Sequence, residues 1–361
     1  MTLASERTGR DPRRRTIRKQ QPEPSGAARS CAVSGEALDA LDRLSGVRNI
    51  TVRRDVPLSQ YTRFGIGGPA DFFLETADEA SFAQALAIVR TSGLNSVVIG
   101  GGTNLIVSDE GFRGVCMRLT GDRIGADGFR VESQCGATLQ ALVDFTVAKG
   151  LKGIETMTGI PGSVGAAVYG NAGAYGHSIQ ERVRSVRFLD RDTTAEFTNA
   201  ECGFRYRESV FKSNKHWIIL SVVLEMEAAD AEELRQTSER ILTTRNAKYP
   251  PEMRCAGSIF KNFLLSELPA RVVAEIPPKV IIEGKVPSAW FLEQVGAKGM
   301  RQGGIEVAGY HANLIYNAGG GTARELLQIV SELKDRVRRR WDIPLEEEVQ
   351  YVGFSEAARH A

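Results

Sequence analysis

The stretch IETMTGIPGSVGAAVYGNAGAYG, residues 154–176, is the most informative part of this 361-residue sequence. It is rich in glycine and alanine, contains one proline and carries almost no charge. A linker would be more polar, and a core helix would not contain so many glycines. Glycine-rich backbone presents N–H groups to anions and lets a large planar ligand come close, so the stretch is a candidate binding loop. A tightly packed turn of small residues is the alternative, and the stretch alone does not decide between them.

A second glycine run, Gly100–Gly102, lies within VVIGGGTNLIVSD, directly after a predicted strand. Phosphate-binding loops commonly occupy this place, although a tight turn between two strands fits equally well. The dinucleotide fingerprint GxGxxG is absent, and Leu105–Val107 has the composition of a strand, so a Rossmann fold is disfavoured. Two such loops in successive α/β blocks suggest one extended, phosphate-bearing cofactor between them.

A strand–helix–strand unit precedes the second glycine run. Phe72–Glu75 is short and aromatic, Asp78 is a plausible helix N-cap, and Ala80–Thr91 is helical in composition and is followed by Gly93. Ser96–Ile99 is the next strand, which completes a βαβ unit. Further predicted elements are a helix over Leu139–Lys149, strands over Val183–Leu189 and Trp217–Glu225, helices over Asp230–Arg245 and Thr322–Arg340, and a strand over Glu348–Val352.

The composition is that of a soluble globular protein of two or three domains, with 42% hydrophobic and 25% charged residues. A net charge of +2 gives no reason to expect nucleic acid as the main partner. The five cysteines form no CxxC pair and the four histidines no cluster, so neither a disulfide framework nor a metal site is predicted. No signal peptide or membrane-spanning segment is found, and we expect a cytoplasmic monomer.

Seven motifs in series resemble one family. They are YTRFGIGGPADFF, VIGGGTNLIVSDEGFRGV, GIETMTGIPGSVGAAVYGNAGAYG, ECGFRYRESVFK, AGSIFKN, HANLIYNAGGGTA and EEEVQYVG. In this order they resemble the UDP-N-acetylenolpyruvoylglucosamine reductases, the flavoenzymes of peptidoglycan precursor synthesis. The resemblance extends from about Val52 to Gly353.

The resemblance implies an α+β protein. Its FAD-binding fold would be of the para-cresol methylhydroxylase and vanillyl-alcohol oxidase type, followed by a C-terminal α+β substrate-binding domain. We place the FAD-binding domain at residues 46–228, with subdomains 46–114 and 115–228, and the C-terminal domain at 229–361. Residues 1–45, whose beginning is rich in arginine, are expected to be a disordered basic tail.

The resemblance also implies a reaction. NADPH would reduce non-covalently bound FAD, and the flavin would then pass a hydride to C3 of the enolpyruvyl sugar nucleotide to give UDP-N-acetylmuramate. Arg207 matches the family arginine that stabilises the developing negative charge, and Glu348 matches the catalytic glutamate. Ser258 matches the donor of the proton at C2. A carboxylate beside an enol intermediate would have to be protonated or paired with Arg207.

By resemblance, two loops would contact FAD and a further set would contact the sugar nucleotide. The expected FAD contacts are Gly100, Gly101, Gly102, Thr103, Asn104, Leu105, Ile160, Pro161, Gly162, Ser163, Gly165, Ala166, Ala167, Asn171 and Gly173. The expected substrate contacts are Tyr206, Arg245, Lys248, Lys261 and Asn262, of which Arg245 and Lys248 are candidate diphosphate ligands.

Each catalytic candidate also has an ordinary interpretation. Ser258 could be a turn residue, Arg207 a member of a surface ion pair, and the glutamate run a solvated face. Two other functions fit the same fold. One is a flavin oxidase, which would often tether FAD through His or Cys, and the other is a sugar-nucleotide sensor without catalysis. The joint presence of the three candidates argues against the sensor.

Three departures from the family pattern concern the substrate contacts. Phe263 stands where proline is usual, residues 264–299 form a longer segment than expected, and Ile305–Glu306 replace a small residue and an amide. The chain also lacks the long tyrosine-bearing insertion of one family branch. We therefore expect the shorter type, with a substrate lid built in another way.

Overall fold

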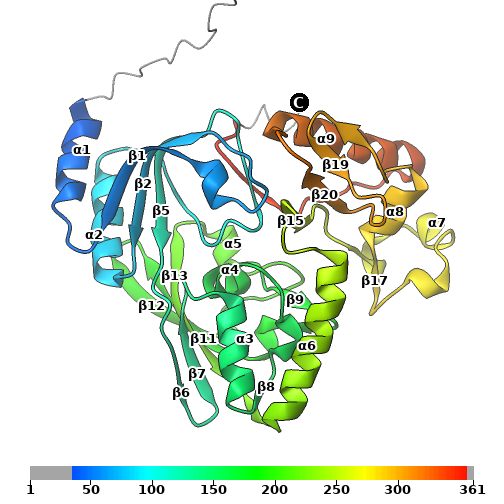
Figure 1. Cartoon of the computed structure of the whole chain (residues 1–361), viewed down its shortest axis with the longest axis horizontal. Coiled ribbons are helices and arrows are strands. Elements are labelled where there is room, and N and C mark those ends of the chain that lie inside the picture. The colour runs from blue at the N-terminus through cyan, green and yellow to red at the C-terminus, as the bar shows by residue number, and fades with distance from the viewer. Residues whose placement is uncertain (1–34, 356–361) are drawn as a thin grey trace, which may run out of the picture.

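The computed structural model describes residues 35–355, which form three packed parts, each built around a sheet (Figure 1). The first two parts share one large hydrophobic core, and the first part has a smaller cluster around Phe73. The core of the third part also includes Phe64, Ile66 and Ile106 from the first part. The chain crosses between the parts more than once, and these crossings position the candidate site.

The first part is a four-stranded sheet with a βαβ unit. In spatial order its strands are β1 (Thr51–Pro57), β2 (Pro69–Thr76), β5 (Phe112–Leu119) and β3 (Ser96–Val98). Strands β2 and β3 both run parallel to β5, and helix α2 (Glu79–Thr91) connects them. The predicted cap is present, because the Asp78 carboxylate accepts a hydrogen bond from the Ser81 N–H at 2.7 Å. The predicted βαβ unit is therefore present.

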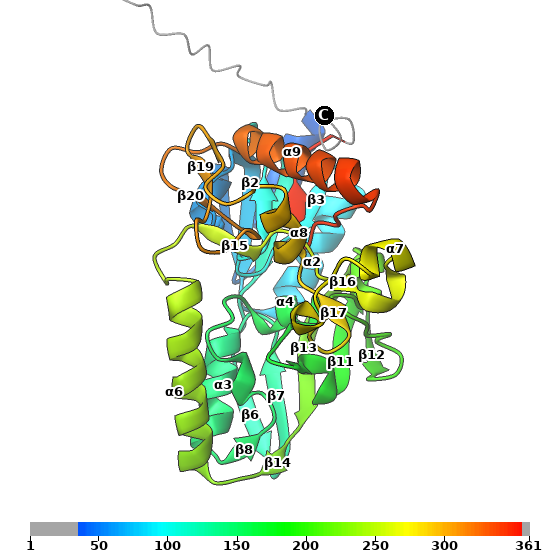
Figure 2. The ribbon, with the colours of Figure 1, turned by 90° about the vertical axis from the view of Figure 1, so that its right-hand side faces the viewer.

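The second part is a five-stranded antiparallel sheet. In spatial order its strands are β12 (Thr193–Thr198), β11 (Val183–Asp190), β13 (Trp217–Glu225), β7 (Arg130–Gln134) and β6 (Ile124–Asp127). Its helices are α3 (Leu139–Ala148), α4 (Val164–Tyr169), α5 (Val210–Ser213) and α6 (Ala231–Lys248). Figure 1 and Figure 2 show α3 and α6 side by side along one side of this sheet.

The third part is a smaller antiparallel sheet packed on a long helix. In spatial order its strands are β15 (Cys255–Ser258), β20 (Leu314–Asn317), β19 (Ile305–Val307) and β18 (Arg301–Gln302). Its helices are α7 (Ala270–Val273), α8 (Ser288–Gln294) and α9 (Ala323–Trp341). Helix α9 begins at a capping box of Thr322 and Glu325, and its apolar face joins a core in which Phe291 and Trp341 meet edge to face at 5.1 Å.

Short elements complete the described chain. They are helix α1 (Gly35–Ser45), strands β4 (Leu105–Val107), β8 (Leu151–Lys152), β9 (Gly173–Ala174), β10 (His177–Ser178), β14 (Glu227–Ala228), β16 (Phe263–Leu264), β17 (Lys285–Val286) and β21 (Gln350–Val352), and 3-10 turns at Leu58–Tyr61, Glu155–Met157, Ile179–Glu181, Leu265–Glu267 and Pro278–Val280.

The last strand returns to the first part of the chain. Strand β21 pairs in parallel with β4, with Gln350 opposite Leu105. The Asn104 side-chain amide also donates a hydrogen bond to the Glu348 carbonyl at 3.0 Å. The end of the described chain therefore lies beside the loop that follows Gly100–Gly102.

The predicted division between residues 114 and 115 is wrong, because it falls within β5. Gly114 marks a bulge in this strand: Ala70 is opposite Phe112 and Phe72 is opposite Val115, so β5 gains one residue over β2. A strand can pass through such an irregularity without ending.

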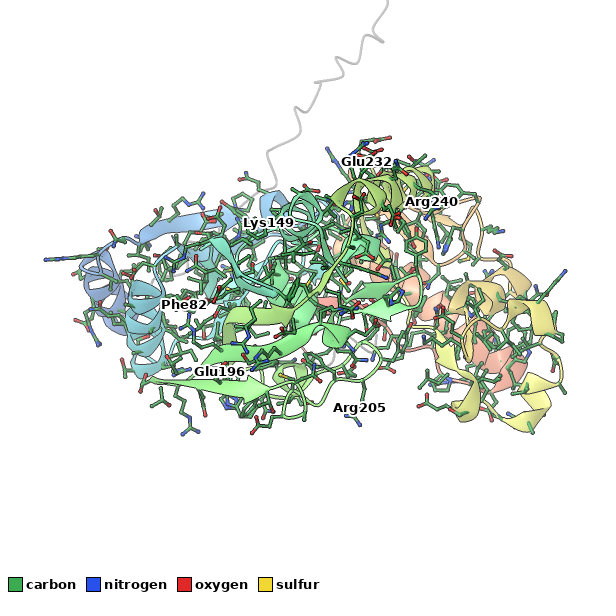
Figure 3. The ribbon with its side chains drawn as sticks, turned by 90° about the horizontal axis from the view of Figure 1, so that it is seen from below. Phe82, Lys149, Glu196, Arg205, Glu232 and Arg240 are labelled. Atoms are coloured by element: carbon green, nitrogen blue, oxygen red, sulfur yellow. The ribbon has the colours of Figure 1, made fainter. Side chains whose placement is uncertain are left out.

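The predicted start of the C-terminal domain at residue 229 also differs from the structure. Helix α6 packs against α3, with Leu234 buried in the shared core of the first two parts. The side chains of Glu232 and Arg240 lie on its outer, exposed face, whereas Phe82 of α2 lies inside the molecule (Figure 3). This helix is highly charged, but its few inward-facing residues decide where it docks.

The predicted tail over residues 1–45 needs a correction at its end. Residues 35–45 form α1, in which Ala40 and Leu44 are fully buried, and Leu44 packs into the shared core. The apolar spacing of this segment is helical, and packing against α2 supplies the stability that a short isolated helix lacks. The remainder of the predicted tail, residues 1–34, lies outside the described residues.

The described residues 35–355 contain neither a membrane-spanning helix nor a cluster of metal-ligating side chains. None of their helices is long and apolar enough to cross a bilayer. They also contain no group of three or more His, Cys, Asp or Glu side chains arranged to hold a metal ion.

Candidate active site

The two glycine loops contact each other. A Cβ added at Gly101 would lie 3.2 Å from the Gly162 Cα, and one at Gly100 would lie 2.7 Å from the Ser163 Oγ. The Thr103 hydroxyl also donates a hydrogen bond to the Pro161 carbonyl at 3.1 Å. Side chains larger than hydrogen at these glycines would separate the loops.

Gly102 shows the tightest constraint in this region. Its φ of +66° lies in the left-handed region, and an added Cβ would lie 1.7 Å from the Tyr61 carbonyl oxygen. Within residues 35–355, the backbone N–H groups of Gly101, Gly102 and Thr103 meet no hydrogen-bond acceptor. Consecutive unpaired N–H groups in a glycine turn form a concave anion site, which suits the pyrophosphate of a dinucleotide cofactor.

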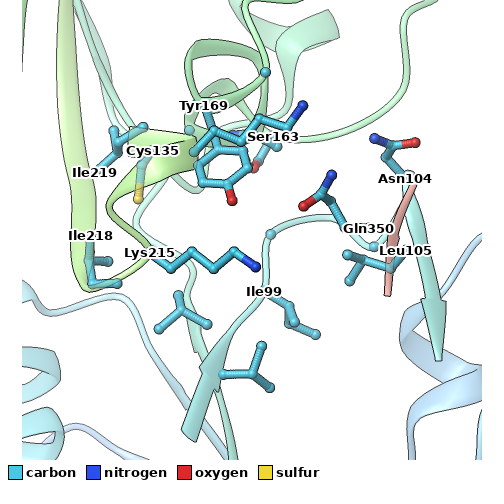
Figure 4. Close-up of a pocket in the computed structure, with 18 of the residues that line it drawn as sticks. Ile99, Asn104, Leu105, Cys135, Ser163, Tyr169, Lys215, Ile218, Ile219 and Gln350 are labelled. Carbon is cyan, nitrogen blue, oxygen red and sulfur yellow. Dashed lines mark hydrogen bonds between the residues drawn. The ribbon is translucent and has the colours of Figure 1, made fainter. Parts of the chain in front are cut away.

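A cavity of about 520 Å³ extends from these loops. Its apolar lining comes from β3, from the loop that follows it and from β13, as expected for a planar ring system. In Figure 4, Tyr169 and Lys215 project into the cavity from one side, and Gln350 faces them from the other.

The predicted FAD contacts divide between several environments. Those that line the large cavity are Gly100, Gly101, Gly102, Thr103, Asn104, Leu105, Ser163, Gly165 and Ala166. Asn171 and Gly173 line a second cavity of about 460 Å³. Ile160, Pro161, Gly162 and Ala167 are not among the residues of either lining. Ala167 is buried in the shared core, whereas Gly162 faces the other glycine loop.

Arg207 and Glu348 form an ion pair where the two cavities meet. The Arg207 Nε lies 2.7 Å from a Glu348 carboxylate oxygen, and each side chain is about one quarter exposed, 24% and 23% respectively. Both residues line the large cavity, and Arg207 also lines the second one. An Nη of Arg207 donates a hydrogen bond to the Gly173 carbonyl at 3.1 Å. The guanidinium is thereby held on two sides.

Arg207 has an unusual backbone. Its φ is +59°, in the left-handed region, where a residue with a Cβ is disfavoured by about 1–2 kcal/mol. The Lys212 ammonium donates a hydrogen bond to the Arg207 carbonyl at 2.9 Å and so stabilises this conformation. Strained backbone of this kind often accompanies functional residues.

Ser258 ends β15, directly after Gly257, whose φ is +74°. Its hydroxyl lies 3.4 Å from the Tyr249 hydroxyl, and it lines neither of the two cavities. The next residue, Ile259, accepts a backbone hydrogen bond from the Glu348 N–H at 2.8 Å. The fold therefore brings the Ser258 and Glu348 segments side by side.

Tyr249 was missed by the sequence analysis. The Arg245 guanidinium carbon and the Lys248 ammonium lie 5.6 and 5.2 Å from its ring centroid, so both predicted diphosphate ligands flank it. Burial lowers the pKa of Arg245, which is consistent with a cation kept in a partly dehydrated place. Its position after a lysine in AKYPP carried no recognisable signal.

The remaining predicted substrate contacts lie around the second cavity. Tyr206 and Asn262 line it, and the Asn262 N–H donates a hydrogen bond to the Tyr206 hydroxyl at 3.3 Å. Lys261 lines neither cavity, because its ammonium is paired with the carboxylates of Glu208 and Glu346.

The structure shows where the residues that depart from the family pattern lie. Phe263 packs edge to face on Phe291 at 4.9 Å, and Ile305 is fully buried in the third part. The long segment after Phe263 includes Lys285, whose ammonium lies 5.3 Å from the centroid of the Tyr206 ring. This segment therefore reaches the second cavity.

Comparisons with known proteins agree on one family. Residues 249–352 match the model described as the C-terminal domain of UDP-N-acetylenolpyruvoylglucosamine reductase, and residues 70–198 match that of an FAD-binding domain. The start of the first match at residue 249 is consistent with the docking of α6 on the preceding part.

Sequence and structure relatives carry the same description. A UDP-N-acetylenolpyruvoylglucosamine reductase of Solibacter usitatus is 62% identical over 311 residues, which are 86% of this chain and 100% of that protein. One of Bacillus subtilis is 33% identical over 300 residues, 82% of this chain and 92% of that protein. The crystal structure of the Thermus caldophilus reductase, 28% identical, superposes with a TM-score of 0.67 and covers 84% of this chain and 99% of that one.

Proposed function

The chain belongs to the UDP-N-acetylenolpyruvoylglucosamine reductase family, and on that premise we propose that Arg207, Ser258 and Glu348 carry out its chemistry. It is an FAD-dependent oxidoreductase of peptidoglycan precursor synthesis, with the predicted α+β fold. We further propose that NADPH is its electron source.

The described residues fit FAD. The unpaired N–H groups of Gly101, Gly102 and Thr103 would hold its pyrophosphate, and the adjoining cavity would receive its rings. Bound FAD would accept a hydride from NADPH and deliver it to C3 of the enolpyruvyl group. Lys215 also lines this cavity and supplies positive charge that phosphate oxygens would balance, whereas Lys212 and Arg90, which line it too, are paired with Glu208 and Asp192.

We expect the cofactor to be non-covalent. Cys135 lines the cavity, but burial raises the pKa of its thiol to about 12, so the reactive thiolate is not formed near neutral pH. His216 also lines the cavity and is the other residue there of a type that can tether a flavin. A mass spectrum of the denatured protein decides the point, because retained flavin mass would identify a tether and favour the oxidase alternative.

Arg207 would stabilise the charge that develops on the substrate. Addition of hydride at C3 places negative charge on C2 and on the neighbouring carboxylate, and a guanidinium already in position lowers that barrier. Glu348 would orient Arg207 through their 2.7 Å contact and limit the repulsion between its own charge and the intermediate. This ion pair at the junction of the two cavities is the observation that carries the proposal.

Ser258 would donate the proton to C2. A serine hydroxyl is a weak acid, but a carbanion of enol type is a far stronger base, so the transfer is downhill once the two are in contact. The neighbouring Tyr249 hydroxyl, 3.4 Å away, offers a route by which Ser258 regains its proton. Ser258 would have to meet C2 of the substrate outside the two cavities, because it lines neither of them.

The substrate contacts fit a sugar nucleotide. Arg245 and Lys248 would meet its diphosphate, and Tyr206 and Asn262 would line its path through the second cavity. A cytoplasmic location and a monomeric state, without nucleic acid as partner, stay predictions.

The test is spectroscopic. Purified protein should be yellow with an FAD spectrum, and NADPH consumption under anaerobic conditions should continue only when the enolpyruvyl sugar nucleotide is added. Colourless protein that fails to bind added FAD would contradict the proposal. NADPH turnover that is indifferent to the sugar nucleotide would contradict the substrate assignment.

A further inference from the structure

Four charged side chains alternate in sign beside the Arg207–Glu348 pair. The Glu208 carboxylate accepts hydrogen bonds from the Lys212 ammonium at 2.9 Å and from the Lys261 ammonium at 2.7 Å. Lys261 also contacts the Glu346 carboxylate. We refer to Lys212, Glu208, Lys261 and Glu346 as the Glu208 cluster.

The Glu208 cluster joins the three segments that hold the proposed catalytic residues. Glu208 follows Arg207, Lys261 lies on the segment that begins at Ser258, and Glu346 precedes Glu348 by two positions. Backbone contacts reinforce these links, since the Lys261 N–H donates to the Glu346 carbonyl at 2.9 Å. One carboxylate, that of Glu208, thus connects the second part of the chain with the third.

Three of the four members of the cluster are more protected than an ordinary surface ion pair, whereas the Glu346 side chain is 70% exposed. The side chains of Lys261, Lys212 and Glu208 are 10%, 14% and 31% exposed. Burial alone would raise the pKa of Glu208, but hydrogen bonds from Lys261 and Lys212 outweigh it, and the pKa is lowered. Burial would likewise lower the pKa of Lys261, but its two carboxylate partners raise it overall. Each charge therefore depends on its partners.

The cluster also reaches the backbone of Arg207. The ammonium of Lys212 donates to both the Glu208 carboxylate and the Arg207 carbonyl, at 2.9 Å in each case. Arg207 is the residue with a φ of +59°, and its guanidinium direction depends on that backbone. Loss of the Glu208 charge would free Lys212 and relax this hold.

We propose that Glu208 is a positioning residue, which holds Arg207 and the Ser258 and Glu348 segments in register across the two parts of the chain. The inference rests on the proposed function, because register matters only if these residues act on one substrate. It also changes the expectation for Lys261, whose ammonium would serve the Glu208 cluster instead of contacting the substrate.

The proposal predicts which half-reaction slows when the Glu208 cluster is disrupted. Arg207 and Ser258 act only when the flavin is reoxidised by the enolpyruvyl substrate, so misplacement of their segments affects that half-reaction. Displacement of reacting groups by about 1 Å can cost up to a hundredfold in rate. Reduction of the flavin by NADPH needs none of these residues as charge or proton donors.

The experiment compares Glu208→Gln and Glu208→Asp with the wild type and with Glu232→Gln. Glu232 is a matched control, because its carboxylate also pairs with a basic side chain, Arg235, but on the exposed face of α6. Stopped-flow absorbance follows each half-reaction, and the flavin content and melting temperature report folding.

The expected result is a slowing of flavin reoxidation in Glu208→Gln by about tenfold to a hundredfold at saturating substrate, with KM changed less than about threefold. Flavin reduction should change less than about twofold. Glu208→Asp, which keeps the charge but shortens the reach, should recover part of the rate. It also keeps the test decisive if the Gln variant loses flavin.

Two results would overturn the inference. Glu208→Gln and Glu208→Asp that both behave like Glu232→Gln would make the Glu208 cluster an ordinary ion-pair group. A rise in KM alone, reproduced by Lys261→Met, would assign Lys261 to substrate binding instead. Failure of the proposed function is distinct, because then wild-type reduced flavin would not be reoxidised by the substrate at all.

Discussion

The Nε of Arg207 lies 2.7 Å from a carboxylate oxygen of Glu348, although Arg207 follows the glycine-rich stretch 154–176 and Glu348 lies just before the last strand, β21. The parallel pairing of β21 with β4 places Glu348 beside the loop that follows Gly100–Gly102, and this loop lines the same cavity as Arg207. A guanidinium that already has a carboxylate partner is oriented before substrate arrives, which is the state that electrostatic catalysis requires.

The first prediction removes this partner. Glu348→Gln keeps the shape of the side chain but not its charge, so Arg207 loses its orienting contact and flavin reoxidation should slow by about a hundredfold. Flavin reduction by NADPH should stay within about twofold of wild type. Glu347→Gln is the control, because the adjacent Glu347 pairs with Lys334 at 3.0 Å and lines neither cavity. Equal loss in both variants would mean that the charge of this segment, and not the contact with Arg207, matters.

The second prediction concerns the cofactor loop. Gly102→Ala should abolish FAD binding, because the added Cβ would overlap the Tyr61 carbonyl at a φ of +66°. Gly128→Ala is a matched control, since Gly128 has a φ of +57° but nothing within 4 Å of the added Cβ. The control should lose only about 1 kcal/mol of stability from its backbone conformation and keep its flavin. Normal flavin absorbance in Gly102→Ala would show that the loop does not hold the cofactor.

The third prediction concerns acid stability. Burial, with a further contribution from Lys248, lowers the pKa of His311 from 6.5 to about 4. The unfolded chain therefore binds a proton between these values that the folded protein does not, so stability is full above about pH 6.5 and falls as the pH drops toward 4. His311→Gln should remove this component, which is on the order of 1 kcal/mol for a partly exposed ring.

Urea unfolding at about pH 7 and about pH 5 measures the difference. The wild type should lose more free energy of unfolding between the two values than His311→Gln does. An equal loss of free energy of unfolding in both proteins would mean that protonation of the His311 ring does not destabilise the folded protein.

Local patterns in the sequence predicted much of the first two parts. Asp78 and the apolar run after it gave the start of α2, and the aromatic and β-branched composition of Val183–Leu189 gave most of β11. Such elements depend on capping and on burial of one face, both of which are written in neighbouring residues.

Long-range packing explains what was missed. The charged α6 docks on α3 through Leu234, and α1 docks through Leu44, although neither contact has a local signal. The pairing of β21 with β4 likewise joins segments far apart in sequence. Boundaries drawn from composition cannot register such contacts, because each depends on a partner surface elsewhere in the chain.

The candidate site likewise has some residues that local sequence indicates and others that only long-range packing reveals. The glycine runs could be recognised as candidate binding loops from residue type, because left-handed backbone and close approach select glycine, but the family resemblance was needed to assign them to FAD. Tyr249 and Glu208 were missed as site residues, since a tyrosine and a glutamate have many ordinary uses on a surface. Their significance comes from the side chains that the fold places around them, Ser258 in one case and two lysines in the other.

The central claim is that Ser258 gives the proton to C2, and Ser258→Ala tests it most directly. Stopped-flow absorbance should show flavin reduction by NADPH unchanged within about twofold, because that step takes no proton from Ser258. Reoxidation by the enolpyruvyl sugar nucleotide should slow by about a hundredfold or more, the usual contribution of a positioned general acid. Equal slowing of both half-reactions, or of neither, would contradict the account.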